Sequence, residues 1–167
     1  MGKARRYIWQ AVLILYIAFI FSNSLTPAAR SSAESGFVMA KIHALLGAIG
    51  MRDVSWLTEH LIRKGAHFTE YTLMGILLFR SMKTLDCGKI VIVRKIHEAA
   101  AFMIPFVDET LQLFTEGRSG QISDVWLDMC GVAAGLCISW VTVQIGLRLH
   151  RAGRAKRSGR GLTGGWI

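Results

Sequence analysis

Ionisable side chains are concentrated in residues 107–128, a stretch that lies between two strongly apolar runs. Carboxylates and a guanidinium at this density can move protons or bind a charged ligand. An ionised carboxylate near the centre of a membrane helix costs about 2.5–3.5 kcal/mol, so it needs a partner or water. The stretch is therefore the first candidate for a functional site, and its ionisable residues are Asp108, Glu109, Glu116, Arg118, Asp124 and Asp128.

A second group of polar residues lies earlier in the chain and has helical spacing. Lys64, His67 and Tyr71 stand at positions i, i+3 and i+7, so they share one face of a helix. Glu70 follows His67 by three residues, within reach of it. We expect this helix to present a cation, an imidazole and a phenol in the same direction.

Helical spacing orders the carboxylates as well. Asp108 and Gln112 are one turn apart, whereas Glu109 points about 100° away from Asp108. Asp124 and Asp128 share a face of the apolar segment that follows. Two more helices are therefore expected to contribute polar groups to the site.

These groups are expected at a similar depth in the membrane. At a rise of 1.5 Å per residue, His67 and Asp108 lie about 20 Å from the basic residues at the inner helix ends, and Asp128 about 30 Å. A hydrocarbon core is about 30 Å thick, so all three fall in its outer half or at its outer edge. Arg118 would cap them from the outer loop.

Two interpretations of this convergence remain open. In the first, Lys64 and Arg118 neutralise the carboxylates of Asp108, Glu109 and Asp128, and the network only holds the helices together. In the second, the groups line a polar cleft open to the outer leaflet, since ionisable residues inside a membrane are functional candidates. The ligand-binding residues would then be Lys64, His67, Tyr71, Asp108, Glu109, Gln112, Arg118, Asp124 and Asp128.

Three classes of function fit such a cleft. In a binding role, Lys64, His67 and Arg118 hold the anionic head group of a membrane lipid or a lipid-linked cell-wall precursor. In an enzyme acting on a lipid-linked phosphate or acyl group, His67 is the base and an acid orients it. A proton-linked transporter is the third class and requires an oligomer, because four short spans leave a narrow path. The catalytic candidates of the enzyme are His67, Glu70, Asp108 and Glu109.

The sequence gives no reason to expect a cofactor or a metal. A divalent ion held by Asp108, Glu109, Asp124 and Asp128 is conceivable, but these residues lack a tight ligand spacing. The three cysteines, Cys87, Cys130 and Cys137, form neither a disulfide framework nor a metal motif. Serines in the Gly-rich turn at 117–123 are interpreted as turn formers rather than nucleophiles.

Composition places these residues in a membrane protein. The 167 residues are 52% hydrophobic with a mean hydropathy of +0.39, which is high for a soluble domain of this length. The net charge of +9 is explained by basic cytoplasmic loops, so a nucleic-acid partner is not expected. The apolar segments are residues 7–21, 68–79, 98–107 and 125–147.

The predicted fold is all-α, an integral membrane four-helix bundle formed by residues 1–147. The weak third segment also allows a re-entrant form with three spans, and the first segment also resembles a signal peptide. Fourteen of the 20 Lys and Arg residues lie in the amino terminus, residues 80–95 and residues 148–160, so both termini are expected in the cytoplasm. The motif Gly131-x-x-x-Gly135 predicts close approach of a neighbouring helix.

Two further segments flank this bundle. Apolar residues in 37–49 recur at near-helical spacing, which predicts an amphipathic helix in the first outer loop, either on the membrane or packed over the bundle. Residues 148–167 are basic and Gly-rich, and we expect a disordered cytoplasmic tail there.

Two motifs resemble those of VanZ-like membrane proteins. "KGAHFTEYTLMG", residues 64–75, is similar to the family's K-x-x-H-F-x-E-Y-x-x-L-G, with Met74 in place of the usual Leu. "DETLQLFTEGRSGQISDVWLDMCG", residues 108–131, is similar to D-E-x-x-Q-x-F-x-x-G-R-x-x-x-x-x-D-x-x-x-N-x-x-G, with Asp128 in place of the usual Asn. "FSNSLTP" resembles the end of the family's first span. The resemblance implies a multi-pass protein of the bacterial cell membrane and a link to resistance to the glycopeptide teicoplanin.

Overall fold

The described part of the chain is entirely helical. The computed structural model describes residues 3–51, 55–84 and 90–161, and these contain five α-helices and no strand. The expectation of an all-α fold is confirmed. The helices are α1 (Lys3–Ser24), α2 (Ala28–Ala48), α3 (Glu59–Lys83), α4 (Ile90–Gln112) and α5 (Ile122–Gly161).

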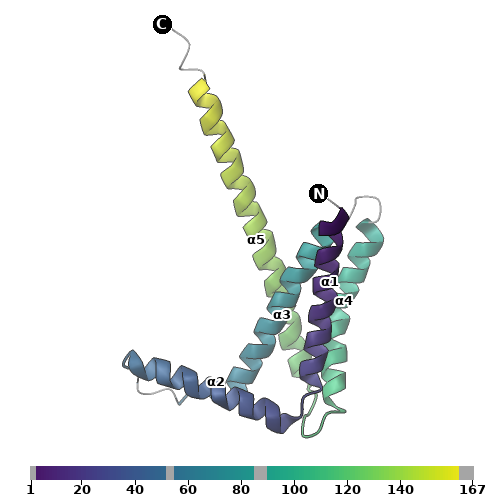
Figure 1. Ribbon diagram of the computed structural model, residues 1–167, viewed down its shortest axis with the longest axis vertical. Helices are drawn as coiled ribbons and strands as arrows, with labels where there is room; N and C mark the ends of the chain where they lie inside the picture. Colours follow the sequence, from purple (N-terminus) through teal and green to yellow (C-terminus); the bar gives the residue numbers. More distant parts are fainter. Residues whose placement is uncertain (1–2, 52–54, 85–89, 162–167) are drawn as a thin grey trace.

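Helices α1, α3 and α4 run side by side, and the first half of α5 packs against α3 (Figure 1). Helix α2 runs across the end of this bundle at which α1 ends and α5 begins. The start of α1 and the end of α5 lie towards the opposite end (Figure 1). The described chain therefore has one end with α2 and the α4–α5 loop, and another end with the start of α1 and the end of α5.

Local sequence signals explain several helix boundaries. Thr58 caps α3, because its side chain accepts a hydrogen bond from Leu61 N at 3.2 Å. Helix α3 also carries Glu59 in its first turn and Arg80 and Lys83 in its last, which suits the helix dipole. Helix α4 continues through Pro105 as one helix of 23 residues.

The contact between α3 and α5 depends on glycines. A Cβ atom added to Gly135 would lie 2.0 Å from Thr72 O, and one added to Gly75 would lie 2.3 Å from Val132 O. A Cβ on Gly131 would come within 2.7 Å of Phe68 O. The close approach expected from Gly131-x-x-x-Gly135 is confirmed.

Apolar side chains are distributed as in a membrane protein. Large apolar residues such as Leu15, Phe106 and Trp140 are exposed, while several polar residues are buried inside the bundle. Helices α1 and α5 contain windows, Tyr7–Ser24 and Ile122–Arg154, that are long and apolar enough to cross a membrane. Among the described helices only these two meet both conditions; α3 and α4, with 25 and 23 residues, are long enough but do not. The buried apolar core consists of Leu13, Ile20, Tyr71, Met74, Leu77, Leu78, Ile104 and Val132.

In the first loop, where a helix was expected, the structure has α2, which begins at Ala28. One expectation differs from the structure at a helix end. Residues 148–167 were expected to be disordered, but α5 continues to Gly161. Arg, Lys, Ala and Leu favour helix, and residues 148–161 contain no proline to interrupt it. Cys87 and residues 162–167 lie outside the described residues.

Candidate functional site

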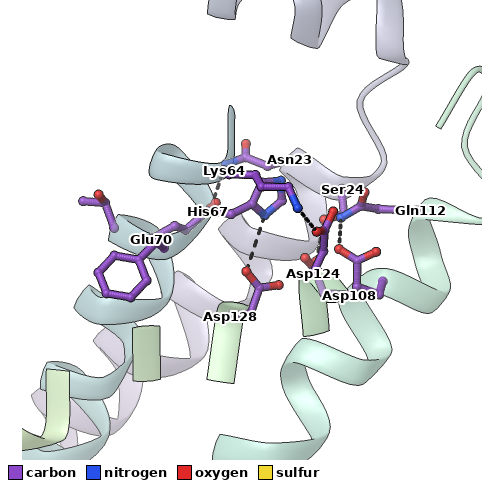
Figure 2. A network of polar contacts seen from close by, with 12 residues as sticks. Asn23, Ser24, Lys64, His67, Glu70, Asp108, Gln112, Asp124 and Asp128 are labelled. Atoms are coloured by element: carbon purple, nitrogen blue, oxygen red, sulfur yellow. Dashed lines mark hydrogen bonds and ion pairs between the residues drawn. The ribbon is translucent and has the colours of Figure 1, made fainter. Parts of the chain in front are cut away.

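The polar residues meet at the end of the bundle that α2 crosses. Helix α3 contributes Lys64 and His67, α4 contributes Asp108, and α5 contributes Asp124 and Asp128 (Figure 2). The end of α1 adds two residues, Asn23 and Ser24 (Figure 2). Three helices were expected to converge here, and four do.

A basic pocket opens at this end, with a volume of about 140 Å³. One water takes about 30 Å³ in the liquid, so the pocket has room for a small ionic group. Its cations are Arg63, Lys64 and Arg118, and its only acidic residue is Asp124. The residues that line this basic pocket are Ala28, Ser31, His60, Arg63, Lys64, His67, Gln112, Gly117, Arg118, Ser119, Gln121, Asp124 and Leu127.

Lys64 forms an ion pair with Asp124 in the basic pocket. Its Nζ donates to Asp124 Oδ1 at 2.8 Å, and the two side chains are 31% and 26% exposed. The structural interpretation pairs Lys64 with Asp108, Glu109 or Asp128, but in the structure Lys64 pairs with Asp124. Among the described side chains, this leaves Arg63 and Arg118 as the pocket cations without a carboxylate in an ion pair.

Arg118 lies in the loop between α4 and α5. Gly117 precedes it with φ of +71°, a left-handed turn conformation that glycine adopts readily. Burial lowers the pKa of the Arg118 guanidinium from its usual value, and the Asp108 carboxylate acts in the opposite direction. The side chain nevertheless stays charged, because arginine is not deprotonated in proteins.

The loop that carries Arg118 is fastened to the other elements. Ala28 N donates to Glu116 O at 3.0 Å, and Thr115 Oγ1 donates to Ser24 O at 3.0 Å. Glu109 is buried and accepts at both oxygens, from Gln112 Nε2 at 3.1 Å and from Gln121 N at 2.9 Å. Glu109 therefore shapes the loop and does not face the pocket.

Beneath the pocket lie His67, Asp108 and Asp128, which we call the His–Asp–Asp cluster (Figure 2); the two aspartates are buried and His67 is partly exposed. Asp108 is 1% exposed and Asp128 is 0% exposed. Ser24 Oγ donates a hydrogen bond to Asp108 Oδ1, and His67 Nδ1 lies 3.9 Å from Asp128 Oδ1. The buried Tyr71 hydroxyl lies close to the Asp108 carboxylate.

Glu70 does not join His67, although three residues separate them in the sequence. Its Oε1 accepts from Asn23 Nδ2 at 2.9 Å, and Tyr16 donates to its backbone carbonyl at 3.0 Å (Figure 2). Glu70 thus binds α1 to α3. The pairing of His67 with Glu70 that an enzyme could use is not formed.

Sequence reasoning missed Arg63, Asn23 and Ser24. Arg63 precedes Lys64 and points about 100° away from it on an ideal helix, so spacing did not place both in one pocket. Asn23 and Ser24 end the first apolar segment. Two adjacent polar residues at the expected depth of the carboxylates were the signal that could have indicated them.

The arrangement suits anion binding better than nucleophilic catalysis. Three cations face the pocket, and arginine presents a planar fork that matches phosphate. Ser119 lines the pocket without a hydrogen bond to a histidine among the described residues. One Ser–His contact, Ser81 Oγ to His97 Nε2 at 3.0 Å, lies at the opposite end of the bundle, with Ser81 fully buried.

Comparison with known proteins supports one family. No curated protein and no solved structure was found to match the chain. The model of the VanZ/LLP1 family matches residues 9–143. This range includes every residue of the basic pocket and of the His–Asp–Asp cluster. The chain therefore belongs to the VanZ/LLP1 family.

Proposed function

We propose that this membrane protein binds an anionic head group, carried by a lipid or a lipid-linked cell-wall precursor, in the basic pocket at the outer face of the membrane. The observation that carries the proposal is the gathering of Arg63, Lys64 and Arg118 around one pocket. A phosphate there would accept hydrogen bonds from two guanidinium groups, and each charge-assisted bond is worth about 1.5–3 kcal/mol.

The positions of the carboxylates support an anionic ligand. Acidic residues outnumber basic ones in this region of the sequence, which would repel an anion if all of them faced it. Asp108, Glu109 and Asp128 are buried, and none of them lines the pocket. Asp124, which does line it, is paired with Lys64.

The proposed topology has four spans, α1, α3, α4 and α5, with both termini in the cytoplasm. An even number of spans agrees with the position of the start of α1 and the end of α5 towards one end (Figure 1). Most Lys and Arg residues lie in segments near that end, as the positive-inside rule requires. The pocket then faces outward. Helix α2 exposes Phe37 and Leu45, as does the chain just after it at Ile49, and α2 would lie at the membrane surface beside the pocket.

A lipid-borne ligand fits this placement. A soluble anion would gain only the polar contacts of the pocket, whereas a lipid head group would keep its chains beside the exposed apolar faces of the bundle. Retention of a cell-wall precursor would also provide a physical link to teicoplanin resistance, the role implied by the resemblance to VanZ-like proteins.

An enzyme is the alternative, and the position of His67 favours it. His67 lines the basic pocket and also lies 3.9 Å from Asp128, so it could exchange a proton with a bound phosphate or acyl group. Turnover of a lipid-linked substrate that is lost in His67→Gln would support the enzyme. Binding without product would support the binding role.

The proposal is tested by lipid binding to the purified full-length protein in detergent, measured by native mass spectrometry. The probes are phosphatidic acid and a polyprenyl diphosphate, each compared with the neutral lipid of the same chain length. We expect preferential binding of the charged lipids and its loss in Arg118→Ala. Arg30→Ala is the matched control, because Arg30 is exposed on α2 and pairs with Glu34. Equal binding of charged and neutral lipids would contradict the proposal.

A labelling experiment tests the topology. A cysteine placed at Ser119, in a protein whose own cysteines are replaced, should react with a membrane-impermeant maleimide in intact cells. Reaction only after permeabilisation would place the pocket on the cytoplasmic side and overturn the proposed orientation.

A further inference from the structure

The His–Asp–Asp cluster has the composition and size of a metal site. His67, Asp108 and Asp128 come from three different helices, and each offers one ligand atom. These three atoms all lie within 4.8 Å of one another. Sequence spacing gave no such set, because it grouped Asp108 and Asp128 with Glu109 and Asp124, which have other partners in the structure.

The cluster leaves polar atoms buried without hydrogen bonds. These atoms are His67 Nδ1, Asp108 Oδ2 and both carboxylate oxygens of Asp128. Leaving one buried polar atom unsatisfied costs about 1–3 kcal/mol, and more when the group is charged. Since all three residues carry such atoms and one ligand atom from each lies within 4.8 Å of the others, the cluster points to a missing positively charged partner.

No protein cation among the described side chains provides that partner. Lys64 is bound to Asp124, and Arg63 and Arg118 line the pocket outside the cluster. His67 Nδ1 lies 3.9 Å from Asp128 Oδ1, which is too long for a hydrogen bond. Apart from the Ser24 hydroxyl that donates to Asp108, the two carboxylates are therefore left to a ligand or to protons.

The separations fit a single ion. Imidazole nitrogen and carboxylate oxygen bind Zn²⁺ at about 2.0–2.2 Å, so two ligand atoms on a tetrahedral ion are roughly 3.4 Å apart. The ligand atoms here lie within 4.8 Å of one another, so they need to approach by about 1 Å to share one ion. Small side-chain rotations would close the site, and the hydrogen bond from Ser24 to Asp108 already orients one ligand.

We propose that His67, Asp108 and Asp128 bind one divalent transition-metal ion beneath the basic pocket. An imidazole ligand favours a transition metal such as Zn²⁺ over Mg²⁺ or Ca²⁺, which prefer oxygen ligands alone. Since His67 also lines the pocket, the open coordination position lies towards it. The ion neutralises both buried carboxylates, so this site exists whether or not the pocket binds a lipid head group.

Substitution of Asp128 provides the most specific test of the metal site. The motif that this chain resembles has asparagine at this position, so Asp128→Asn keeps the size of the side chain and removes its charge. A variant of this kind should fold. Asp124→Asn is the matched control, because it removes a carboxylate one turn earlier on the same helix and outside the cluster.

The experiment measures Zn²⁺ binding to the full-length protein in detergent, purified without a histidine tag and stripped with a chelator. Equilibrium dialysis and mass spectrometry of the metal should give about one Zn²⁺ per chain, retained in excess Mg²⁺. We expect the affinity to fall at least tenfold in Asp128→Asn and in His67→Gln and to stay unchanged in Asp124→Asn. Zn²⁺ should also raise the Tm of the wild-type protein and of Asp124→Asn, but not that of Asp128→Asn.

Two outcomes would overturn the metal site. Absence of Zn²⁺ binding by the wild-type protein near neutral pH would leave the carboxyls to protons, and equal affinity in Asp128→Asn would place the metal elsewhere. Lipid binding is measured separately in metal-free buffer. Loss of the metal site with intact lipid binding would therefore refute only this inference, and the reverse result would refute only the proposed function.

Discussion

The basic pocket and the His–Asp–Asp cluster lie next to each other and share His67, but they differ in the sign and the solvent exposure of their charged groups. The pocket keeps its cations at a surface that solvent and ligand can reach, and its one acid is paired. The cluster places two carboxylates where neither has solvent access, with Asp108 and Asp128 at most 1% exposed. Because most carboxylates of this acidic region of the sequence are buried and the cations are accessible, the region presents a basic surface.

Because of this difference, substitutions in the two regions should have different effects on the free energy of folding. A partly exposed charge is solvated, so a pocket residue can be replaced with little effect on folding. A buried carboxylate without a partner opposes folding, and proteins retain such groups mainly at functional sites. Variants in the pocket should therefore change binding, whereas variants in the packing around the cluster should change stability.

The largest effect is expected where both regions are lost together. Gly135→Ala places a Cβ atom 2.0 Å from Thr72 O, so α3 and α5 must separate and the residues from these helices move apart. We expect destabilisation of about 3 kcal/mol or more, and folded protein should be strongly depleted from the membrane. Gly146→Ala, later on the same helix, meets nothing within 4 Å and is the control. Similar thermal unfolding curves for the two variants would show that α3–α5 contact does not position the site.

The second largest effect is expected for a substitution that changes the basic pocket but not the His–Asp–Asp cluster. Arg118→Ala removes one guanidinium from the pocket and leaves the His–Asp–Asp cluster unchanged. Loss of a charge-assisted hydrogen bond to phosphate should lower the affinity for phosphatidic acid about 10- to 100-fold. The Tm should change by only a few degrees, because Arg118 has no ion pair in the described structure. A large fall in Tm with unchanged lipid affinity would reverse the roles of the two regions.

Glu109 is a buried acid that holds the α4–α5 loop, which carries Arg118, by accepting a hydrogen bond from Gln121 N. Glu109→Ala removes both acceptors, leaves Gln121 N–H and the Gln112 amide without their partner, and should destabilise the protein by about 1–3 kcal/mol. The loop that holds Arg118 should loosen, so lipid affinity should also fall. Glu109→Gln keeps one carbonyl acceptor and should recover part of both losses in thermal unfolding and lipid binding. No recovery in Glu109→Gln would contradict this expectation and show that one acceptor oxygen is not enough to hold the loop.

Sequence spacing predicted relations within each helix well. Lys64 and His67 do share a face that meets the site, and Asp124 and Asp128 do lie one turn apart on α5 beside them. The glycines at 131 and 135 were sufficient to predict a close helix contact. These relations depend only on the helical repeat, which the sequence determines locally.

Relations between helices were not predictable in the same way. Which acid pairs with Lys64, and whether Glu70 turns to His67 or to Asn23, depends on the rotation and neighbours of each helix. Those are set by packing between residues far apart in the chain, such as Asn23 and Glu70, which are 47 positions apart. The helical tail after residue 147 was missed for another reason, since its basic and Gly-rich composition outweighed its helix propensity in our interpretation.

The smallest expected effect concerns the ion pair inside the basic pocket. Lys64 and Asp124 are each roughly a quarter to a third exposed, so the attraction at 2.8 Å is partly screened by solvent. A double-mutant cycle with Lys64→Ala, Asp124→Ala and the double variant should give a coupling of about 1 kcal/mol or less in thermal unfolding, and less at high salt. Asp124→Ala should at the same time raise lipid affinity slightly, because it frees Lys64 for the head group. A coupling of several kcal/mol would mean that this pair is desolvated like the His–Asp–Asp cluster, and the contrast between an accessible basic pocket and a dry acidic interior would not hold.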